Sequence, residues 1–159
     1  MQKKFKTVAV GGTFDEFHKG HRTLLTKAFE VGEKVLIGIS SDKFAERMNK
    51  PHATSSYKQR FNELMDFLCK HQLTERAEII QLNDSYGITL SKGCIEALIV
   101  SKETETTARK INEKRREMGM PLLQIVVIDM VPSENHFPIS TTRIYWGEID
   151  REGHLLSEK

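Results

Sequence analysis

Five short apolar runs, separated by stretches with helical periodicity, constrain the fold of this 159-residue chain more than any other feature. Several runs are apolar throughout instead of alternating with polar residues, which is typical of strands that are buried on both faces. The predicted strands span residues 7–10, 34–39, 78–82, 97–100 and 123–128. The predicted helices span residues 21–31, 42–49, 57–71 and 104–118. This alternation predicts an α/β fold in which one open, five-stranded parallel sheet carries helices on both faces.

Length and composition indicate a single domain without a nucleic-acid or membrane partner. We place the domain at residues 1–153. The mostly polar residues 150–159 predict a loosely held end, with residues 154–159 as the tail. The 24 Lys and Arg residues nearly balance the 22 Asp and Glu residues, so the overall field gives no reason to expect either kind of partner.

Two further features predict a cytoplasmic location. The basic N-terminus is followed by a short strand and two glycines instead of an apolar signal segment, and no 18-residue apolar window occurs. Cys69 and Cys94 lack the spacing of a C-x-x-C motif and lie among apolar residues. We therefore expect both to be reduced core residues, which implies a reducing compartment.

Residues 11–21, directly after the first predicted strand, have the composition of a phosphate-binding turn; they read Gly-Gly-Thr-Phe-Asp-Glu-Phe-His-Lys-Gly-His. Gly11 and Gly12 allow the backbone to approach an anion closely, and Thr13 adds a hydroxyl. His18 and His21 lie three residues apart, on one face of the helix that follows. Ligands of open α/β sheets bind outside the carboxyl ends of the strands, so this turn lies where a site is expected.

The histidines admit three interpretations. The chain contains no G-x-x-x-x-G-K-[ST] phosphate loop and no G-x-G-x-x-G motif after the first strand, so these two nucleotide sites are excluded. His18 and His21 could bind a metal, although no further His or Cys lies at helical spacing to complete a zinc site, or they could lack a role. We favour a third interpretation, in which the imidazole N–H groups stabilise charge on a phosphoryl oxygen.

A second segment near the C-terminus predicts a helix that begins with hydroxyl residues. Pro138 is followed by Ile-Ser-Thr-Thr at residues 139–142, and the unpaired N–H groups of such a helix start suit a phosphate. A structural cap without a ligand is the alternative. Arg143 follows directly, and it could bind phosphate or pair with Glu148.

Together, the Gly-Gly-Thr-Phe-Asp, His-x-Gly-His and Ile-Ser-Thr-Thr-Arg motifs resemble the nucleotidylyltransferase superfamily. Within it, residues 6–153 are similar to the archaeal phosphopantetheine adenylyltransferases, also at residues 41–42, 84–87, 100–104 and 147–150. The resemblance implies a Rossmann-like sheet with strand order 3-2-1-4-5. It also implies transfer of AMP from ATP to 4'-phosphopantetheine, with dephospho-coenzyme A and pyrophosphate as products.

The mechanism implied by this resemblance is direct in-line attack on the α-phosphorus, which mainly needs alignment and charge neutralisation. Mg²⁺ would be carried by ATP, with no metal site made by the protein. The partners would be the two small-molecule substrates. A monomer and a homo-oligomer both remain compatible with the charged surface helices.

The resemblance also implies roles for individual residues. The catalytic set would be His21 on the α-phosphate, His18 beside it, and Lys50 at the acceptor phosphate, with Lys43 as the alternative lysine. The nucleotide would contact Gly11, Gly12, Thr13, Phe14, Gly20, Ser140, Thr141, Thr142 and Arg143. The acceptor would contact Thr13, Lys43, Tyr86 and Lys102. Bacterial relatives have an arginine pair after strand four, and here Lys102 or Arg109 would replace it.

Two other functions remain open. An adenylyltransferase for FMN or nicotinamide mononucleotide would share the nucleotide half of the site, and a nucleotide-binding module could keep the fold without catalysis. Cytidylyltransferases of the superfamily usually have Arg-Thr shortly before Ile-Ser-Thr-Thr. That pair is absent from residues 134–138, which argues against CTP.

Overall fold

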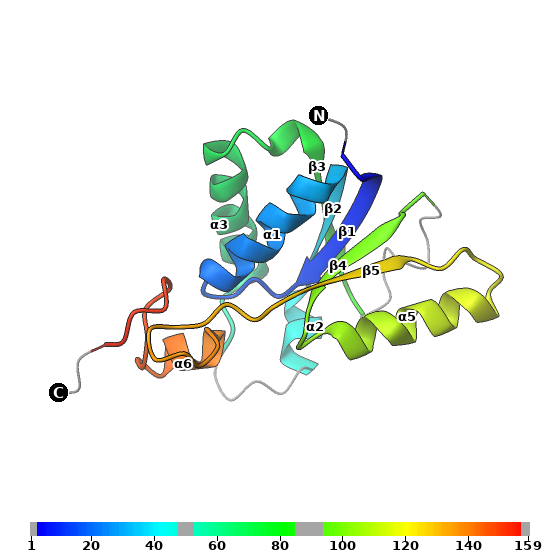
Figure 1. The fold of residues 1–159 in the computed structure, drawn as a ribbon. Helices are drawn as coiled ribbons and strands as arrows, with labels where there is room; N and C mark the ends of the chain where they lie inside the picture. The colour runs from blue at the N-terminus through cyan, green and yellow to red at the C-terminus, as the bar shows by residue number, and fades with distance from the viewer. Residues whose placement is uncertain (1–2, 48–52, 85–93, 157–159) are drawn as a thin grey trace.

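Five parallel strands form one sheet in the order β3-β2-β1-β4-β5, as expected (Figure 1). The computed structural model describes residues 3–47, 53–84 and 94–156. The strands are β1 (Phe5–Gly12), β2 (Gly32–Ser40), β3 (Ala77–Leu82), β4 (Ala97–Ser101) and β5 (Gln124–Ile128). Strand β1 is longer than the predicted 7–10 and includes both glycines of the motif at its end.

Helices lie on both faces of the sheet, which confirms the predicted fold class. They are α1 (Lys19–Val31), α2 (Asp42–Arg47), α3 (Tyr57–Lys70), the short 3₁₀ helix η1 (Thr74–Arg76), α5 (Glu105–Glu117) and α6 (Thr141–Tyr145). Helices α1 and α3 cover one face and α5 covers the other (Figure 1). Among the described residues, no helix combines the length and the apolar character that crossing a membrane requires.

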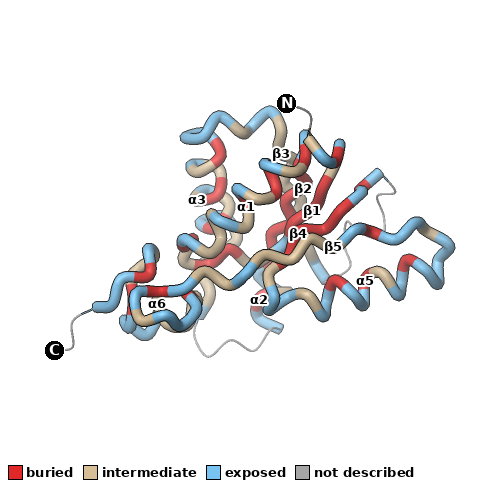
Figure 2. Tube along the Cα trace, in the orientation of Figure 1, coloured by how far each residue is buried: buried red, intermediate tan, exposed pale blue. Residues whose placement is uncertain are grey.

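Each face of the sheet has its own hydrophobic core, which explains why the strands are apolar throughout. Val8 and Val10 of β1 pack in the core beneath α1 and α3, whereas Ala9 packs in the core beneath α5. The buried residues accordingly concentrate in β1, β2 and β4 (Figure 2). The chain moves from β1 outward to β2 and β3 and then crosses to β4, so strand order reverses between β1 and β4. A ligand crevice is expected at the carboxyl ends of these two strands.

Two helix ends follow from local residues of the sequence. Ser56 Oγ accepts a hydrogen bond from the Gln59 backbone N–H and caps α3. Gly119, at φ 72°, follows the end of α5 in the left-handed region that glycine tolerates. Met118, the C-terminal cap of this helix, is 56% exposed.

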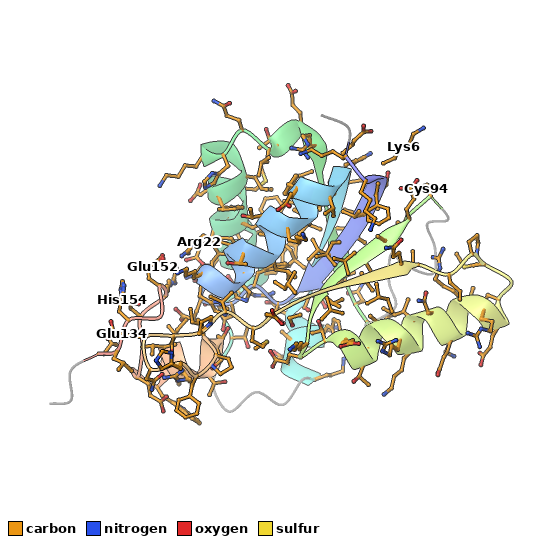
Figure 3. All side chains as sticks on the ribbon, viewed as in Figure 1. Lys6, Arg22, Cys94, Glu134, Glu152 and His154 are labelled. Atoms are coloured by element: carbon orange, nitrogen blue, oxygen red, sulfur yellow. The ribbon has the colours of Figure 1, made fainter. Side chains whose placement is uncertain are left out.

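The expected burial of the two cysteines is wrong. Cys69 and Cys94 are both exposed free thiols. Leu64 and Leu68 form the buried stripe of α3, and Cys69 is turned away from it because successive helical residues point about 100° apart. Cys94 precedes β4, at the opposite end of the molecule from Arg22 and Glu152 (Figure 3).

Residues 150–156, where a loose end is expected from the sequence, form backbone hydrogen bonds in the structure. Asp150 N–H donates to the His154 carbonyl at 2.9 Å, and Leu156 N–H donates to the Glu148 carbonyl at 3.0 Å. Gly153, at φ 87°, allows the tight turn between them. Residues 157–159 lie outside the described residues, and the domain boundary at residue 153 stays a prediction.

Candidate active site

His18 and His21 cap the start of α1 reciprocally. His18 is the N-cap, and its Nδ1 accepts hydrogen bonds from the backbone N–H groups of Gly20 at 3.0 Å and His21 at 3.4 Å. In return, His21 Nδ1 accepts from the His18 N–H at 3.2 Å. This is a capping box built from two imidazoles, and it satisfies N–H groups that a helix start otherwise leaves unpaired. The rings stack with their centroids 3.7 Å apart.

The capping box also fixes where each imidazole holds its proton. A neutral ring has one donor nitrogen and one acceptor nitrogen, and Nδ1 is the acceptor in both histidines. The proton therefore lies on Nε2 of His18 and of His21. Burial, helped by the charges of Arg22 and Arg151, lowers the pKa of His18 from 6.5 to about 4, against a weaker opposing effect of Asp15. His18 is neutral at physiological pH, and a neutral imidazole whose Nδ1 accepts a hydrogen bond offers Nε2–H as its donor.

Gly20 is needed because the His18 ring lies against it. A Cβ atom at this position would be 2.8 Å from His18 Cε1 and 3.0 Å from His18 Nδ1. Any side chain at this position would push the His18 imidazole away from the Gly20 N–H, from which its Nδ1 accepts a hydrogen bond. The glycine in His-x-Gly-His is therefore explained by close approach of the ring.

The turn between β1 and α1 has a strained backbone. We call residues 11–21 the histidine turn. Its positive φ values fall on Phe14 at 56° and Glu16 at 53°, whereas Gly11 and Gly12 end strand β1. Residues other than glycine lose roughly 1–2 kcal/mol in this conformation, so surrounding contacts must hold it. Phe14 is 1% exposed, and its ring meets the His21 ring edge-on at 5.3 Å between centroids.

The structure brings the two sequence motifs together. Ser140 caps α6 by accepting a hydrogen bond from the Arg143 N–H at 3.2 Å, as predicted. Thr141 Oγ1 donates to the Asp15 carbonyl at 3.0 Å, across 126 residues of sequence. Thr142 is the next residue of α6. The start of α6 therefore lies against the histidine turn, and the Thr141 hydroxyl joins them.

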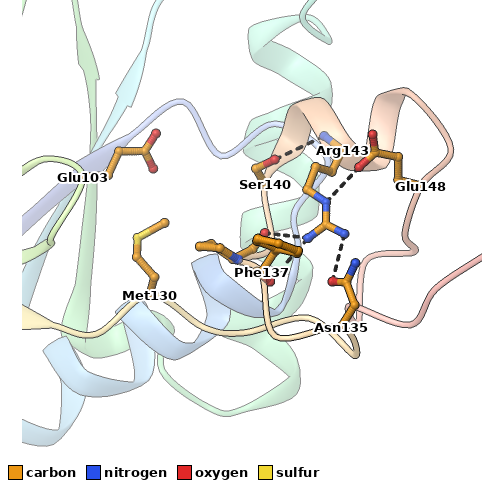
Figure 4. A pocket seen from close by; sticks show the side chains of 8 residues that line it. Glu103, Met130, Asn135, Phe137, Ser140, Arg143 and Glu148 are labelled. Atoms are coloured by element: carbon orange, nitrogen blue, oxygen red, sulfur yellow. Dashed lines mark hydrogen bonds and ion pairs between the residues drawn. The ribbon is translucent and has the colours of Figure 1, made fainter.

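Arg143 has protein partners on all sides of its guanidinium. Nε donates to Glu148 at 2.9 Å, which is the pairing alternative from the sequence. Nη1 donates to the Ser133 hydroxyl and to the carbonyls of residues 137 and 138, and Nη2 donates to Asn135 Oδ1 at 3.2 Å (Figure 4). These contacts hold the loop before α6. Phosphate binding by Arg143 stays a prediction.

A cavity of about 560 Å³ lies beside this loop. Its lining residues come from the segment after β4, the segment after β5 and the start of α6; they are Glu103, Met130, Asn135, Phe137, Pro138, Ser140, Arg143 and Glu148 (Figure 4). One wall is apolar, and Phe137 remains 65% exposed there. An exposed ring beside a pocket is suited to cover a flat, apolar ligand group.

Two residues that hold the histidine turn have no role assigned from the sequence. Buried Asp15 accepts the Ser55 N–H at 3.2 Å with Oδ1, and buried Arg60 donates to the Thr13 carbonyl at 2.9 Å. A signal for Arg60 was available, because it lies on the same helical stripe as Leu64 and Leu68. A charged residue on an apolar stripe indicates a buried polar contact.

The segment 150–156 also contacts the start of α1. The Arg151 carbonyl accepts the Lys19 N–H at 2.9 Å, and Glu152 pairs with Arg22 (Figure 3). The Arg151 guanidinium bonds Glu16 and Glu63, each at 3.1 Å. These contacts place Arg22 and Arg151 near His18, and their positive charges help to lower its pKa.

The predicted acceptor residues outside the histidine turn are less enclosed. Lys43 is exposed on α2, and exposed Lys102 pairs with Asp129 at 3.2 Å. Arg109, the alternative to Lys102, pairs with Glu105 on α5. Lys50 and Tyr86 lie outside the described residues. Within residues 3–47, 53–84 and 94–156, no three His, Cys, Asp or Glu side chains gather closely enough to hold a metal ion.

Comparisons with known proteins agree on one family. The family model described as cytidylyltransferase-like matches residues 9–145. The phosphopantetheine adenylyltransferase of Methanothermobacter thermautotrophicus is 46% identical over 156 residues, which cover 98% of this chain and 93% of that protein. The phosphopantetheine adenylyltransferase of Pyrococcus abyssi is 42% identical over 158 residues, with 98% and 99% covered. A solved structure of a protein of unknown function from Archaeoglobus fulgidus has a TM-score of 0.69 and 34% identity, with 78% of this chain and 98% of that chain covered.

Proposed function

Because this chain belongs to the cytidylyltransferase-like family, and within it to the archaeal phosphopantetheine adenylyltransferases, we propose that it transfers AMP from ATP to 4'-phosphopantetheine. The products are dephospho-coenzyme A and pyrophosphate, so the enzyme acts in coenzyme A biosynthesis. The observation in the structure that supports this most is the hydrogen bond between Thr141 Oγ1 and the Asp15 carbonyl. It joins the two motifs that nucleotidyl transfer requires.

The reaction is a single displacement. A phosphate oxygen of 4'-phosphopantetheine attacks the α-phosphorus of ATP, the bond from that phosphorus to the bridging oxygen breaks, and pyrophosphate leaves with the electron pair. Both reactants are already a good nucleophile and a good electrophile, so the enzyme mainly aligns them and neutralises charge. No covalent intermediate with the protein is formed.

The two imidazoles stabilise the transition state as hydrogen-bond donors. Since Nδ1 of both His18 and His21 is occupied in the capping box, each donates through Nε2–H. His21 donates to the α-phosphate, where charge accumulates as the phosphorus becomes five-coordinate, and His18 assists it. The donors are held before the substrate binds, so little reorganisation is needed during the reaction.

The nucleotide occupies the cavity and the start of α6. The apolar wall with Met130, Phe137 and Pro138 suits the adenine ring. Ser140 and Thr142, at the start of α6, would hold the β- and γ-phosphates. The remaining nucleotide contacts are those proposed from the sequence; they are Gly11, Gly12, Thr13, Phe14, Gly20, Thr141 and Arg143. Mg²⁺ arrives with ATP and neutralises charge on its phosphates.

The acceptor half of the site contains the candidate lysines. Lys43 or Lys50 neutralises the acceptor phosphate, and Tyr86 and Lys102 contact the pantetheine arm or its phosphate. For Lys102 this requires release from Asp129, which costs little because exposed ion pairs contribute at most about 1 kcal/mol. With ATP as the nucleotide substrate, the cytoplasm is the proposed compartment.

The proposed function is tested by pyrophosphate release from Mg²⁺-ATP, with 4'-phosphopantetheine, nicotinamide mononucleotide and FMN offered in separate reactions. We expect turnover with 4'-phosphopantetheine alone. Turnover with another acceptor only would assign the same chemistry to a different substrate. ATP binding without turnover on any acceptor would favour a nucleotide-binding module.

A further inference from the structure

Arg60 of α3 is a fully buried cation, with 0% of its surface exposed. Nε donates to the Ser55 carbonyl at 2.8 Å. Nη1 donates to the carbonyls of Thr13 at 2.9 Å and Ser40 at 2.8 Å. Nη2 donates to Asp42 Oδ1 at 3.1 Å. A buried charge is tolerated when paired and hydrogen-bonded in this way, and the rigid fork of arginine suits several fixed acceptors.

The partners of Arg60 all lie at the carboxyl edge of the sheet but belong to different segments. Thr13 follows β1, Ser40 ends β2, Ser55 precedes α3, and Asp42 begins α2. One guanidinium therefore ties the histidine turn to the neighbouring strand and to two helices. Lysine, with a single nitrogen, could not reproduce this fork.

The contact with Thr13 adjoins the strained part of the histidine turn. Phe14, the next residue, has a φ of 56°, and such a conformation persists only when its surroundings determine it. On the other side of Phe14, Asp15 accepts hydrogen bonds from the Ser55 N–H and from the Thr141 hydroxyl. Arg60 is the cation that fixes the strand-side end of this turn.

We propose that Arg60 is a positioning residue for AMP transfer, which fixes the Thr13 carbonyl and thereby the alignment of the histidine turn with both substrates. This inference rests on the proposed adenylyltransferase function. It assigns Arg60 no contact with a substrate. Its effect is expected on the rate of the chemical step, because small misplacements of reacting groups cost rate more than binding.

The chain contains a matched control in Arg115. This arginine is also 0% exposed, and its Nε donates to the Pro121 carbonyl at 2.8 Å. It lies on α5, which packs on the opposite face of the sheet from α3 (Figure 1). Replacement of either arginine by glutamine removes a buried cation from a helix, but only Arg60 contacts the histidine turn.

The experiment compares Arg60→Gln and Arg115→Gln with the wild-type enzyme. Tm, kcat and the KM for ATP are measured, with kinetics at a temperature where near-ultraviolet circular dichroism shows every variant folded. Both substitutions should lower Tm. Arg60→Gln should lower kcat by about 10- to 100-fold with the KM for ATP nearly unchanged, and Arg115→Gln should keep the wild-type kcat.

Equal kcat values for Arg60→Gln and the wild type, or an equal loss in both variants, would overturn the proposal. If Arg60→Gln does not fold, Asp42→Ala decides, because Asp42 is 59% exposed in its side chain and anchors Nη2 of Arg60. This variant should fold and lose about threefold in kcat, and an unchanged kcat would overturn the proposal. Absence of turnover by the wild type would instead contradict the proposed function.

Discussion

The two halves of the proposed site differ in how firmly the protein holds them. The histidine turn is bonded to α3, α6 and residue 151 by Arg60, Thr141 and the Lys19 N–H before any substrate is present. In contrast, Lys43 and Lys102, the described candidate lysines of the acceptor half, are exposed. The chemical step depends on the placement of donors within a fraction of an ångström. Attraction between opposite charges falls slowly with distance, so a lysine can neutralise the acceptor phosphate without being held as precisely.

This difference separates two kinds of mutational effect. Residues of the rigid half should change kcat, because their contacts strengthen in the transition state. Residues of the exposed half should change the KM for the acceptor, because they interact with the ground state and the transition state alike.

The largest effect is expected for His21→Ala. Loss of a donor to the α-phosphate should lower kcat by about 100- to 1,000-fold, with the KM for ATP nearly unchanged. Steady-state kinetics with saturating 4'-phosphopantetheine measure both values. The matched control is His71→Ala, which removes an exposed imidazole at the end of α3 and should keep the wild-type kcat. A loss of ATP affinity as large as the loss of rate would refute the role assigned to His21.

The second largest effect is expected for two substitutions of His18, which separate its role as the N-cap of α1 from its role in catalysis. Asparagine is a good N-cap, whereas alanine is not and costs typically about 1 kcal/mol at such a position. Both His18→Asn and His18→Ala should lose activity, but only His18→Ala should lose stability at neutral pH. Urea unfolding and turnover, measured on the same preparations, test this. Full activity in His18→Asn would show that capping is the only role of the imidazole.

His18 also predicts a pH dependence of stability. The pKa of His18 is about 4 in the folded protein, lowered chiefly by burial, against an ordinary value of 6.5. Between these values the unfolded chain binds more protons, so the free energy of unfolding should fall as pH falls from about 6.5 to 4, by up to about 3 kcal/mol from this group. Urea unfolding across this range should give a steeper loss for the wild type than for His18→Asn. Parallel curves for the two proteins would contradict the lowered pKa.

The smallest effects are expected for the exposed lysines. Lys43→Ala and Lys102→Ala should each raise the KM for 4'-phosphopantetheine by about 3- to 10-fold, since surface charges contribute on the order of 1 kcal/mol. Their kcat should stay close to that of the wild type. Lys27→Ala, on α1 and paired with Glu30, is the control for removing a partly exposed lysine. A fall in kcat comparable to that of His21→Ala would erase the proposed difference between the two halves.

The fold could be predicted from the sequence because its signals are local. Apolar runs predicted the strands, and the resemblance of three motifs to a known superfamily implied the order 3-2-1-4-5, which is confirmed. The family is confirmed by the comparisons as well. The Ser140 cap and the capping role of Ser56 follow from residue type and spacing alone. The individual catalytic and binding roles stay predictions.

The contacts that hold the site depend on residues far apart in sequence. Nothing near Arg60 shows that its partners are the carbonyls of Thr13 and Ser40, because backbone acceptors have no sequence signature. The polar composition of residues 150–156 predicts a loose end and gives no sign that Arg151 joins Glu16 and Glu63. Both cases concern polar side chains whose partners are fixed only when the chain has folded.

Direct transfer at the α-phosphorus is the central claim, and the stereochemistry at that atom tests it most directly. A single diastereomer of ATP with sulfur on the α-phosphorus is turned over with 4'-phosphopantetheine, and ³¹P nuclear magnetic resonance gives the configuration of the thio-substituted dephospho-coenzyme A. One in-line displacement, aligned by the histidine turn, predicts inversion. Retention would mean two displacements through a covalent intermediate, and it would contradict the account.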